Sequence, residues 1–168
     1  MPEKLGKRTD QRLALLKNQV SELLWYGEIE TTVDRAKSVR SLAEKYITLA
    51  IRTYQDDVKV TKNVKNDKGN LVAVEFTNDG PKKLAARRRL MAELVDLQEV
   101  KGDKESKAAF RARIKDTKHP LIEKLFKEYA PKYDARRNEL GQGGGYTRIL
   151  KTGFRRGDAA QTCIIRLV

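Results

Sequence analysis

The residues best suited to chemistry lie near the C-terminus, where glycine, aromatic and basic residues follow one another. The chain reads Gly-Gly-Gly-Tyr-Thr-Arg-Ile-Leu-Lys over residues 143–151 and Arg-Arg-Gly-Asp over 155–158. Glycine lets a backbone approach a phosphate closely, arginine offers a planar fork of donors to phosphate oxygens, and a tyrosine ring can stack on a base. The residue types alone support two interpretations equally. One is a phosphate-binding segment, and the other is a glycine hinge followed by a strand with solvated basic residues.

The net charge favours the phosphate-binding interpretation. The chain has 168 residues with 36 Lys+Arg and 23 Asp+Glu, so its formal net charge is +13, and residues 108–168 alone contribute +8 from 14 basic and 6 acidic residues. A second basic run, Arg87-Arg88-Arg89, falls in a helical pattern. A positive charge of this size indicates a polyanionic partner that neutralises it. The commonest such partner is nucleic acid, and the next is an anionic membrane. No apolar run approaches the ~18 residues that a membrane-spanning helix needs.

No residue pattern indicates catalysis. His119 is the only histidine, and its position before Pro120 in a polar stretch predicts an exposed side chain. Cys163 alternates with apolar residues, which is typical of a small core residue. Glu28 and Glu30 share one face of a short strand and are interpreted as a solvated strand edge. We therefore expect no enzyme activity, metal or cofactor. A single cysteine without a visible signal peptide favours the cytoplasm.

Apolar periodicity outlines the elements that position these residues. Spacings of three and four predict helices over 10–26, 33–52 and 81–97, the second with an apolar stripe of Ala36, Val39, Ala43, Ile47 and Ala50. A further helix is expected to open at Pro120 and to stop at Pro131. Alternation predicts strands over 28–32, 146–152 and 162–168, with a turn at 153–158.

Two stretches look like additions to this core. Residues 55–79 alternate on either side of a turn at 66–70, which predicts an inserted β-hairpin, although a flexible loop is the alternative. Residues 99–119 are polar and predict an extended linker with one or two helical turns at 108–114. The fold class is therefore α/β: one domain over 1–168, with two layers, several helices on a small mixed sheet, a C-terminal β-hairpin and an inserted one.

The chain resembles the bacterial large-subunit ribosomal protein seventeen family. The resemblance rests on motifs whose order and spacing match over roughly 5–52, 82–98 and 120–168, while 53–81 is an insertion relative to shorter members. The motifs are LGKRT at 5–9, RLALLKN at 12–18, GEIETT at 27–32 with RAK at 35–37, LF at 125–126, YAPKY at 129–133, GGYTRILK at 144–151 and RGDAA at 156–160. The resemblance implies a compact α/β protein without catalytic activity, embedded in large-subunit ribosomal RNA near the nascent-chain exit side.

Charge and resemblance together predict a structural constituent of the large ribosomal subunit. The expected partners are ribosomal RNA and neighbouring ribosomal proteins, with no membrane and no small-molecule substrate. A free-standing RNA chaperone or translation regulator is the alternative. A phosphate-handling enzyme would need a metal or nucleophile cluster that the sequence lacks. The residues expected to contact RNA are Lys4, Lys7, Arg8, Arg12, Arg35, Lys37, Arg40, Arg87, Arg88, Arg89, Tyr146, Thr147, Arg148, Lys151, Arg155 and Arg156.

Overall fold

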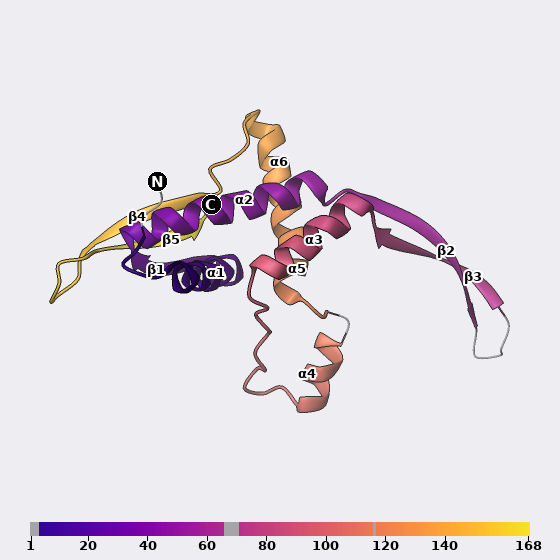
Figure 1. Cartoon of the computed structure of the whole chain (residues 1–168). Helices are drawn as coiled ribbons and strands as arrows, with labels where there is room; N and C mark the ends of the chain where they lie inside the picture. The colour runs from indigo at the N-terminus through magenta and orange to yellow at the C-terminus, as the bar shows by residue number, and fades with distance from the viewer. Residues whose placement is uncertain (1–3, 66–70, 116) are drawn as a thin grey trace.

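A small sheet covered on one face by two long helices forms one end of the protein, opposite the strands at 57–65 and 71–79 (Figure 1). The computed structural model describes residues 4–65, 71–115 and 117–168. The sheet has the strand order β1-β5-β4, and both pairings are antiparallel. The elements of this part are α1 (Thr9–Tyr26), β1 (Glu28–Thr32), α2 (Val33–Thr53), β4 (Thr147–Phe154) and β5 (Gln161–Leu167).

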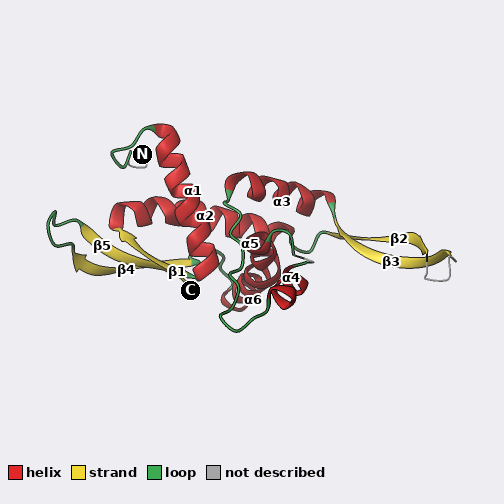
Figure 2. Ribbon diagram, turned by 90° about the horizontal axis from the view of Figure 1, so that it is seen from below, coloured by secondary structure: helices red, strands yellow, loops and turns green. Residues whose placement is uncertain are grey.

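The helix–sheet core follows the predicted apolar pattern. The alanine-rich stripe of α2 is fully buried along its length, which confirms the prediction for that helix. Cys163 and Ile165 of β5 face the helices, so the alternation predicted there is confirmed as well. Gly27 ends α1 with a left-handed backbone (φ 86°), and its N–H bonds the Leu23 carbonyl, so the chain can turn directly into β1. Leu13 is 58% exposed because the first turns of α1 extend beyond its partners (Figure 2).

A second group of helices packs beside α2. Its elements are α3 (Pro81–Glu93), α5 (Pro120–Lys124), a π-helical turn (Leu125–Tyr129) and α6 (Ala130–Leu140). The prediction that Pro131 stops the helix is wrong, because α6 runs through it. The Ala130 N–H bonds the Leu125 carbonyl five residues back, and this wide turn accommodates Pro131 in the first turn of α6. The predicted helix over 81–97 ends at Glu93, where Leu94 becomes extended.

The two predicted additions project from this body. β2 (Asp57–Lys65) and β3 (Leu71–Asp79) form an antiparallel ribbon with Asp57 opposite Asp79 and Lys65 opposite Leu71. The turn predicted at 66–70 lies outside the described residues. The linker carries the short helix α4 (Lys107–Ile114), which buries none of its residues. Figures 1 and 2 show the ribbon extending away from the helices.

The predicted α/β fold with its two hairpins is therefore confirmed, with one correction. The three-stranded sheet is antiparallel throughout instead of mixed. The connection between β4, which ends at Phe154, and β5, which begins at Gln161, is too short for the crossover that parallel neighbours need. In the part of the chain that the structure describes, no helix combines the length and apolar character needed to cross a bilayer.

Candidate nucleic-acid interface

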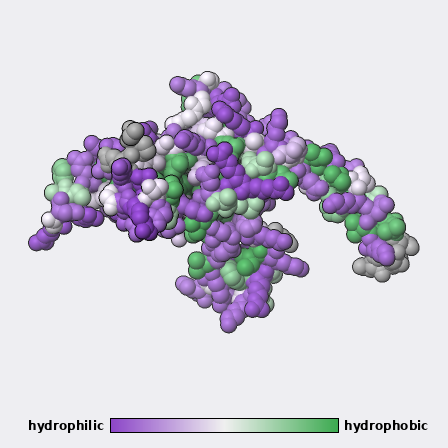
Figure 3. Space-filling model, in the orientation of Figure 1, coloured by the Kyte–Doolittle hydropathy of each residue, from purple (hydrophilic) through white to green (hydrophobic). Residues whose placement is uncertain are grey.

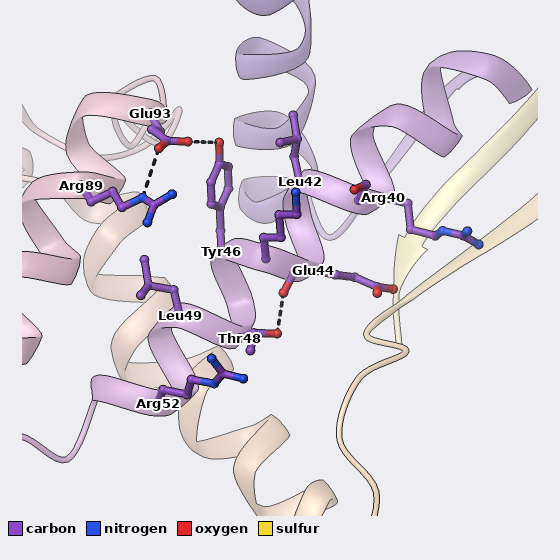
Figure 4. A pocket seen from close by; sticks show the side chains of 11 residues that line it. Arg40, Leu42, Glu44, Tyr46, Thr48, Leu49, Arg52, Arg89 and Glu93 are labelled. Atoms are coloured by element: carbon purple, nitrogen blue, oxygen red, sulfur yellow. Dashed lines mark hydrogen bonds and ion pairs between the residues drawn. The ribbon is translucent and has the colours of Figure 1, made fainter. Parts of the chain in front are cut away.

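A groove rich in basic side chains lies between α2 and α3. It is open to solvent and has a volume of about 720 Å³. Figure 4 shows its side chains, most of them from α2 and two from the end of α3. The charged residues that line it are Arg40, Lys45 and Arg52 of α2 and Arg89 of α3, together with Glu44 and Glu93. Four cations against two carboxylates leave the groove positive.

Protein donors hold both carboxylates of the groove. The Tyr46 hydroxyl donates to Glu93 Oε2 at 2.6 Å, and Arg89 Nε donates to Glu93 Oε1 at 3.2 Å. The hydrogen bond from Tyr46 is the main reason why the pKa of Glu93 is lowered. Glu44 Oε1 accepts from the Thr147 hydroxyl at 2.9 Å. The two acids thus hold α2 to neighbouring elements through hydrogen bonds. In contrast, Arg40, Lys45 and Arg52 remain exposed.

The positive surface continues from Arg52 to the glycine run. A neighbouring depression of about 370 Å³ is lined by Arg52, Arg137, Gly143 and Gly144, among others. The Arg137 side chain lies along the glycine backbone, since a Cβ on Gly143 would lie 3.6 Å from Arg137 Cδ. Gly144 has a φ of 96°, a conformation that favours glycine. We call the combined surface of Arg40, Lys45, Arg52, Arg89 and Arg137 the basic groove.

A second basic surface lies on β4, β5 and the turn that joins them. Arg148 and Arg166 are register partners on the sheet face turned away from the helices. In the turn, Arg155 donates to both oxygens of Asp158, at 3.0 and 2.5 Å. This contact lowers the pKa of Asp158 to about 2. Asp158 therefore braces the turn. We call Arg148, Lys151, Arg155, Arg156 and Arg166 the C-terminal surface.

Tyr146 is built into the core, and Thr147 beside it is partly buried. The Tyr146 ring is only 4% exposed and packs against the ring of Tyr133, with 4.8 Å between centroids. The prediction that Tyr146 stacks on a base does not fit this burial, because stacking needs an exposed ring face. The Thr147 hydroxyl is occupied by Glu44. Of the motif at 143–151, the glycines and the basic residues remain accessible to solvent.

The arginine run on α3 divides into two roles. The Arg87 side chain is only 17% exposed and lies between Asp79 of β3 and Glu123 of α5, at 2.6 and 2.5 Å. The contact with Glu123 is a hydrogen bond from Nη1, and the contact with Asp79 is an ion pair. Its guanidinium also lies 4.9 Å from the centroid of the Phe126 ring. Arg87 therefore joins three elements, whereas Arg88 and Arg89 are exposed.

The remaining predicted RNA-contact residues lie near the start of α1 and in the first turns of α2. Arg8 pairs with Asp10 at 2.8 Å, and Lys37 lies 3.5 Å from Asp34. The other members of this set are Lys4, Lys7, Arg12 and Arg35, of which Arg12 and Arg35 are partly buried. None of these described residues lines the groove of Arg40 or the depression beside Arg52.

Sequence reasoning missed three members of the basic groove. Lys45 and Arg52 fall opposite the apolar stripe of α2, so helical periodicity contained the signal for them. Arg137 had no such signal, because it joins the groove only through the way the glycine run returns along α6.

The residues considered for catalysis occupy the predicted environments. His119 is exposed, with Nδ1 3.1 Å from Asp96. Cys163 is buried, and burial raises the pKa of its thiol. Glu28 and Glu30 are exposed on an edge strand. Among the residues described, no group of three or more His, Cys, Asp or Glu side chains is arranged to hold a metal ion.

Comparison with known proteins gives a consistent result. Residues 15–168 match the family described as ribosomal protein L17. The chain is similar to the large ribosomal subunit protein bL17 of Lachnospira eligens, with 39% identity over 98% of this chain and 97% of the relative. It is also similar to the bL17 proteins of Clostridium acetobutylicum, at 38% identity over 98% and 95% of the two chains, and of Acetivibrio thermocellus, at 36% over 98% and 97%.

Proposed function

The chain belongs to the ribosomal protein L17 family, and we propose on this premise that it is a structural constituent of the large ribosomal subunit that binds the subunit's ribosomal RNA. The basic groove carries the proposal. It places five cations along α2 and the adjoining helices, and among these described residues only Arg89 is bonded to an acid of the groove. RNA phosphates are the polyanions that such a surface fits best.

The groove would act by positioning RNA phosphates. Arg52 and Arg137 each offer a planar guanidinium that can donate to two phosphate oxygens. The exposed glycine backbone beside them lets a strand approach without meeting side chains. Contacts of this kind hold folded RNA through its backbone and its shape, and they read little of the sequence.

The C-terminal surface supplies a second set of contacts in this proposal. Its turn lies at the end of a ribbon, where Arg156 can enter a space between two RNA helices. Arg155 presents its remaining donors while Asp158 holds it in place. The further expectation, carried by the family resemblance, is a position near the nascent-chain exit side, among other ribosomal proteins of a cytoplasmic ribosome. The function is structural, without catalysis.

The test compares charge loss at two places. Lys45, Arg52 and Arg137 are changed together to alanine, and a control variant loses the same charge from the linker at Lys101, Lys104 and Lys107. Binding to isolated large-subunit ribosomal RNA is measured between 50 and 200 mM salt. The affinity of the unmodified chain should fall by ~10³–10⁵-fold over this range if about 6–10 phosphates are contacted. For the groove variant, the slope of the logarithm of the binding constant against the logarithm of the salt concentration should shrink by roughly three.

Two results would contradict the proposal. One is a binding constant that hardly changes with salt, and the other is a slope reduced equally in both variants. A third measurement separates a ribosomal constituent from a free-standing RNA chaperone. The chain should remain with large subunits during sedimentation in high salt, whereas a chaperone should dissociate and stay near the top of the gradient.

A further inference from the structure

The β2–β3 arm, defined as residues 57–65 and 71–79, has two unlike faces. The register places Val60 opposite Phe76 and Val64 opposite Val72, so these side chains share one face. The opposite face is mainly polar. The members of the apolar face are Val58, Val60, Lys62, Val64, Val72, Val74, Phe76 and Asn78. Five of its large apolar side chains are 37–44% exposed, and Figure 3 shows hydrophobic residues along the arm.

We propose that the apolar face of the arm docks onto a neighbouring protein of the large ribosomal subunit, on an apolar surface that carries a carboxylate opposite Lys62. The inference rests on the proposed function and names a partner for a part of the chain that the basic groove does not use. A two-stranded ribbon is marginally stable in water, and an apolar face of this extent marks an interaction site. A partner that covers the face would stabilise both strands.

Charge distinguishes a protein partner from RNA. Residues 57–79 contain four lysines, four acidic residues and no arginine, so their net charge is zero in a chain of +13. A segment that binds phosphates would carry part of the chain's excess positive charge. Lys62 is the only charged residue on the apolar face, and its Nζ lies 5.8 Å from the centroid of the Phe76 ring. A carboxylate on the partner would neutralise this single cation as it loses water.

The same lysine argues against a second copy of this chain. Lys62 lies opposite Val74, near the middle of the face. If two copies packed face to face about a two-fold axis, the axis would bring the two Lys62 ammonium groups close together inside an apolar contact. Like charges that lose water cost several times more than the same pair in solvent. The face is complementary to an acid, and none of its own members is acidic.

The base of the arm is fixed by contacts that set its direction. Lys83 Nζ lies 2.7 Å from Asp57 and 3.3 Å from Asp79, one on each strand. Asp79 also pairs with Arg87. Asp56 Oδ2 accepts from the backbone N–H groups of Lys82 and Lys83, at 2.8 and 3.2 Å, and so holds the start of α3. These contacts orient an arm whose apolar side chains are absent from the core, which indicates that its direction serves a partner.

Photo-crosslinking on intact large subunits tests the proposal. The photoreactive residue p-benzoyl-phenylalanine replaces Val60 or Val74 on the apolar face, and in matched controls it replaces their chain neighbours Thr61 or Ala73 on the other face. Entry of the unmodified chain into salt-washed subunits is scored first, so that failure of the proposed function is recognised separately. If the unmodified chain does not enter the subunits, both the proposed function and the docking proposal are overturned.

The expected result is a crosslink to one ribosomal protein from the two apolar-face positions, resistant to ribonuclease and absent from the two controls. The crosslinked peptide should contain an acidic residue among apolar ones. Lys62→Glu should reduce the yield from the Val74 position by about tenfold or more, whereas Lys62→Arg should retain it. Four results would overturn the proposal: an adduct that ribonuclease removes, an adduct between two copies of this chain, equal yields from both faces, or no adduct from either.

Discussion

Arg87→Ala should destabilise the protein, although Arg87 belongs to a basic run that the sequence predicts to contact RNA. The change removes the cation between Asp79 and Glu123 and the packing on Phe126. Breaking a buried ion pair from one side costs about 3–5 kcal/mol, because the remaining charge stays buried without a partner. Asp79 and Glu123 retain 25% and 24% exposure, so water screens them in part. We therefore expect a loss of about 2–3 kcal/mol, below the fully buried range.

Urea unfolding followed by far-ultraviolet circular dichroism measures this loss. For a chain of this size the expected change corresponds to a melting temperature lowered by about 4–12 °C. Arg88→Ala is the matched control, because the same type of side chain is removed one residue away at an exposed position. It should change the free energy of unfolding by no more than about 0.5 kcal/mol. Arg87→Lys should fall between the two, since an ammonium cannot reach both carboxylates as a guanidinium fork does.

The reasoning is refuted if Arg87→Ala and Arg88→Ala have the same free energy of unfolding. It is also refuted if Arg87→Ala keeps its stability but binds RNA more weakly than Arg88→Ala, because Arg87 would then be an RNA contact. A double-mutant cycle with Glu123→Gln should give a coupling energy of about 0.5–3 kcal/mol, as expected for residues in one ion-pair network.

Three other outcomes are expected. Replacing residues 58–78 by an Asn-Gly turn should leave one cooperative melting transition, because no residue of the arm belongs to the core, and loss of cooperative melting would contradict this. Burial alone would raise the pKa of Glu123, but hydrogen bonds from Arg87 and Lys127 outweigh burial and lower the pKa. Ionised Glu123 therefore stabilises the fold above about pH 4.5, and this stabilisation is lost as the pH falls through the lowered pKa. Glu123→Gln should flatten this part of the dependence of the free energy of unfolding on pH. Within the described residues the buried Tyr133 hydroxyl has no hydrogen-bond partner, so Tyr133→Phe should be neutral or stabilising by up to about 1 kcal/mol, and a loss of stability would reveal a missed partner.

Local patterns predicted the fold class and most elements of this chain. The stripe of α2, the alternation of β5 and the inserted hairpin depend on side chains only a few residues apart, and a helix or strand repeats at that scale. The charge excess was likewise a property of composition. The stop at Pro131 was predicted wrongly, because whether a wide helical turn can receive a proline depends on the packing around it.

The roles of individual charged and aromatic residues depended on contacts between distant parts of the chain. Arg87 and Arg88 are adjacent and chemically identical, yet one is enclosed by Asp79 and Glu123 while the other is exposed. Tyr146 lies in a motif suited to RNA, but Tyr133 covers its ring. The sequence by itself determined how much positive charge the protein has and on which elements it lies. Only the tertiary structure decided which cations meet carboxylates and which remain exposed, because ion pairs act over a few ångströms in space between residues tens of positions apart in the chain.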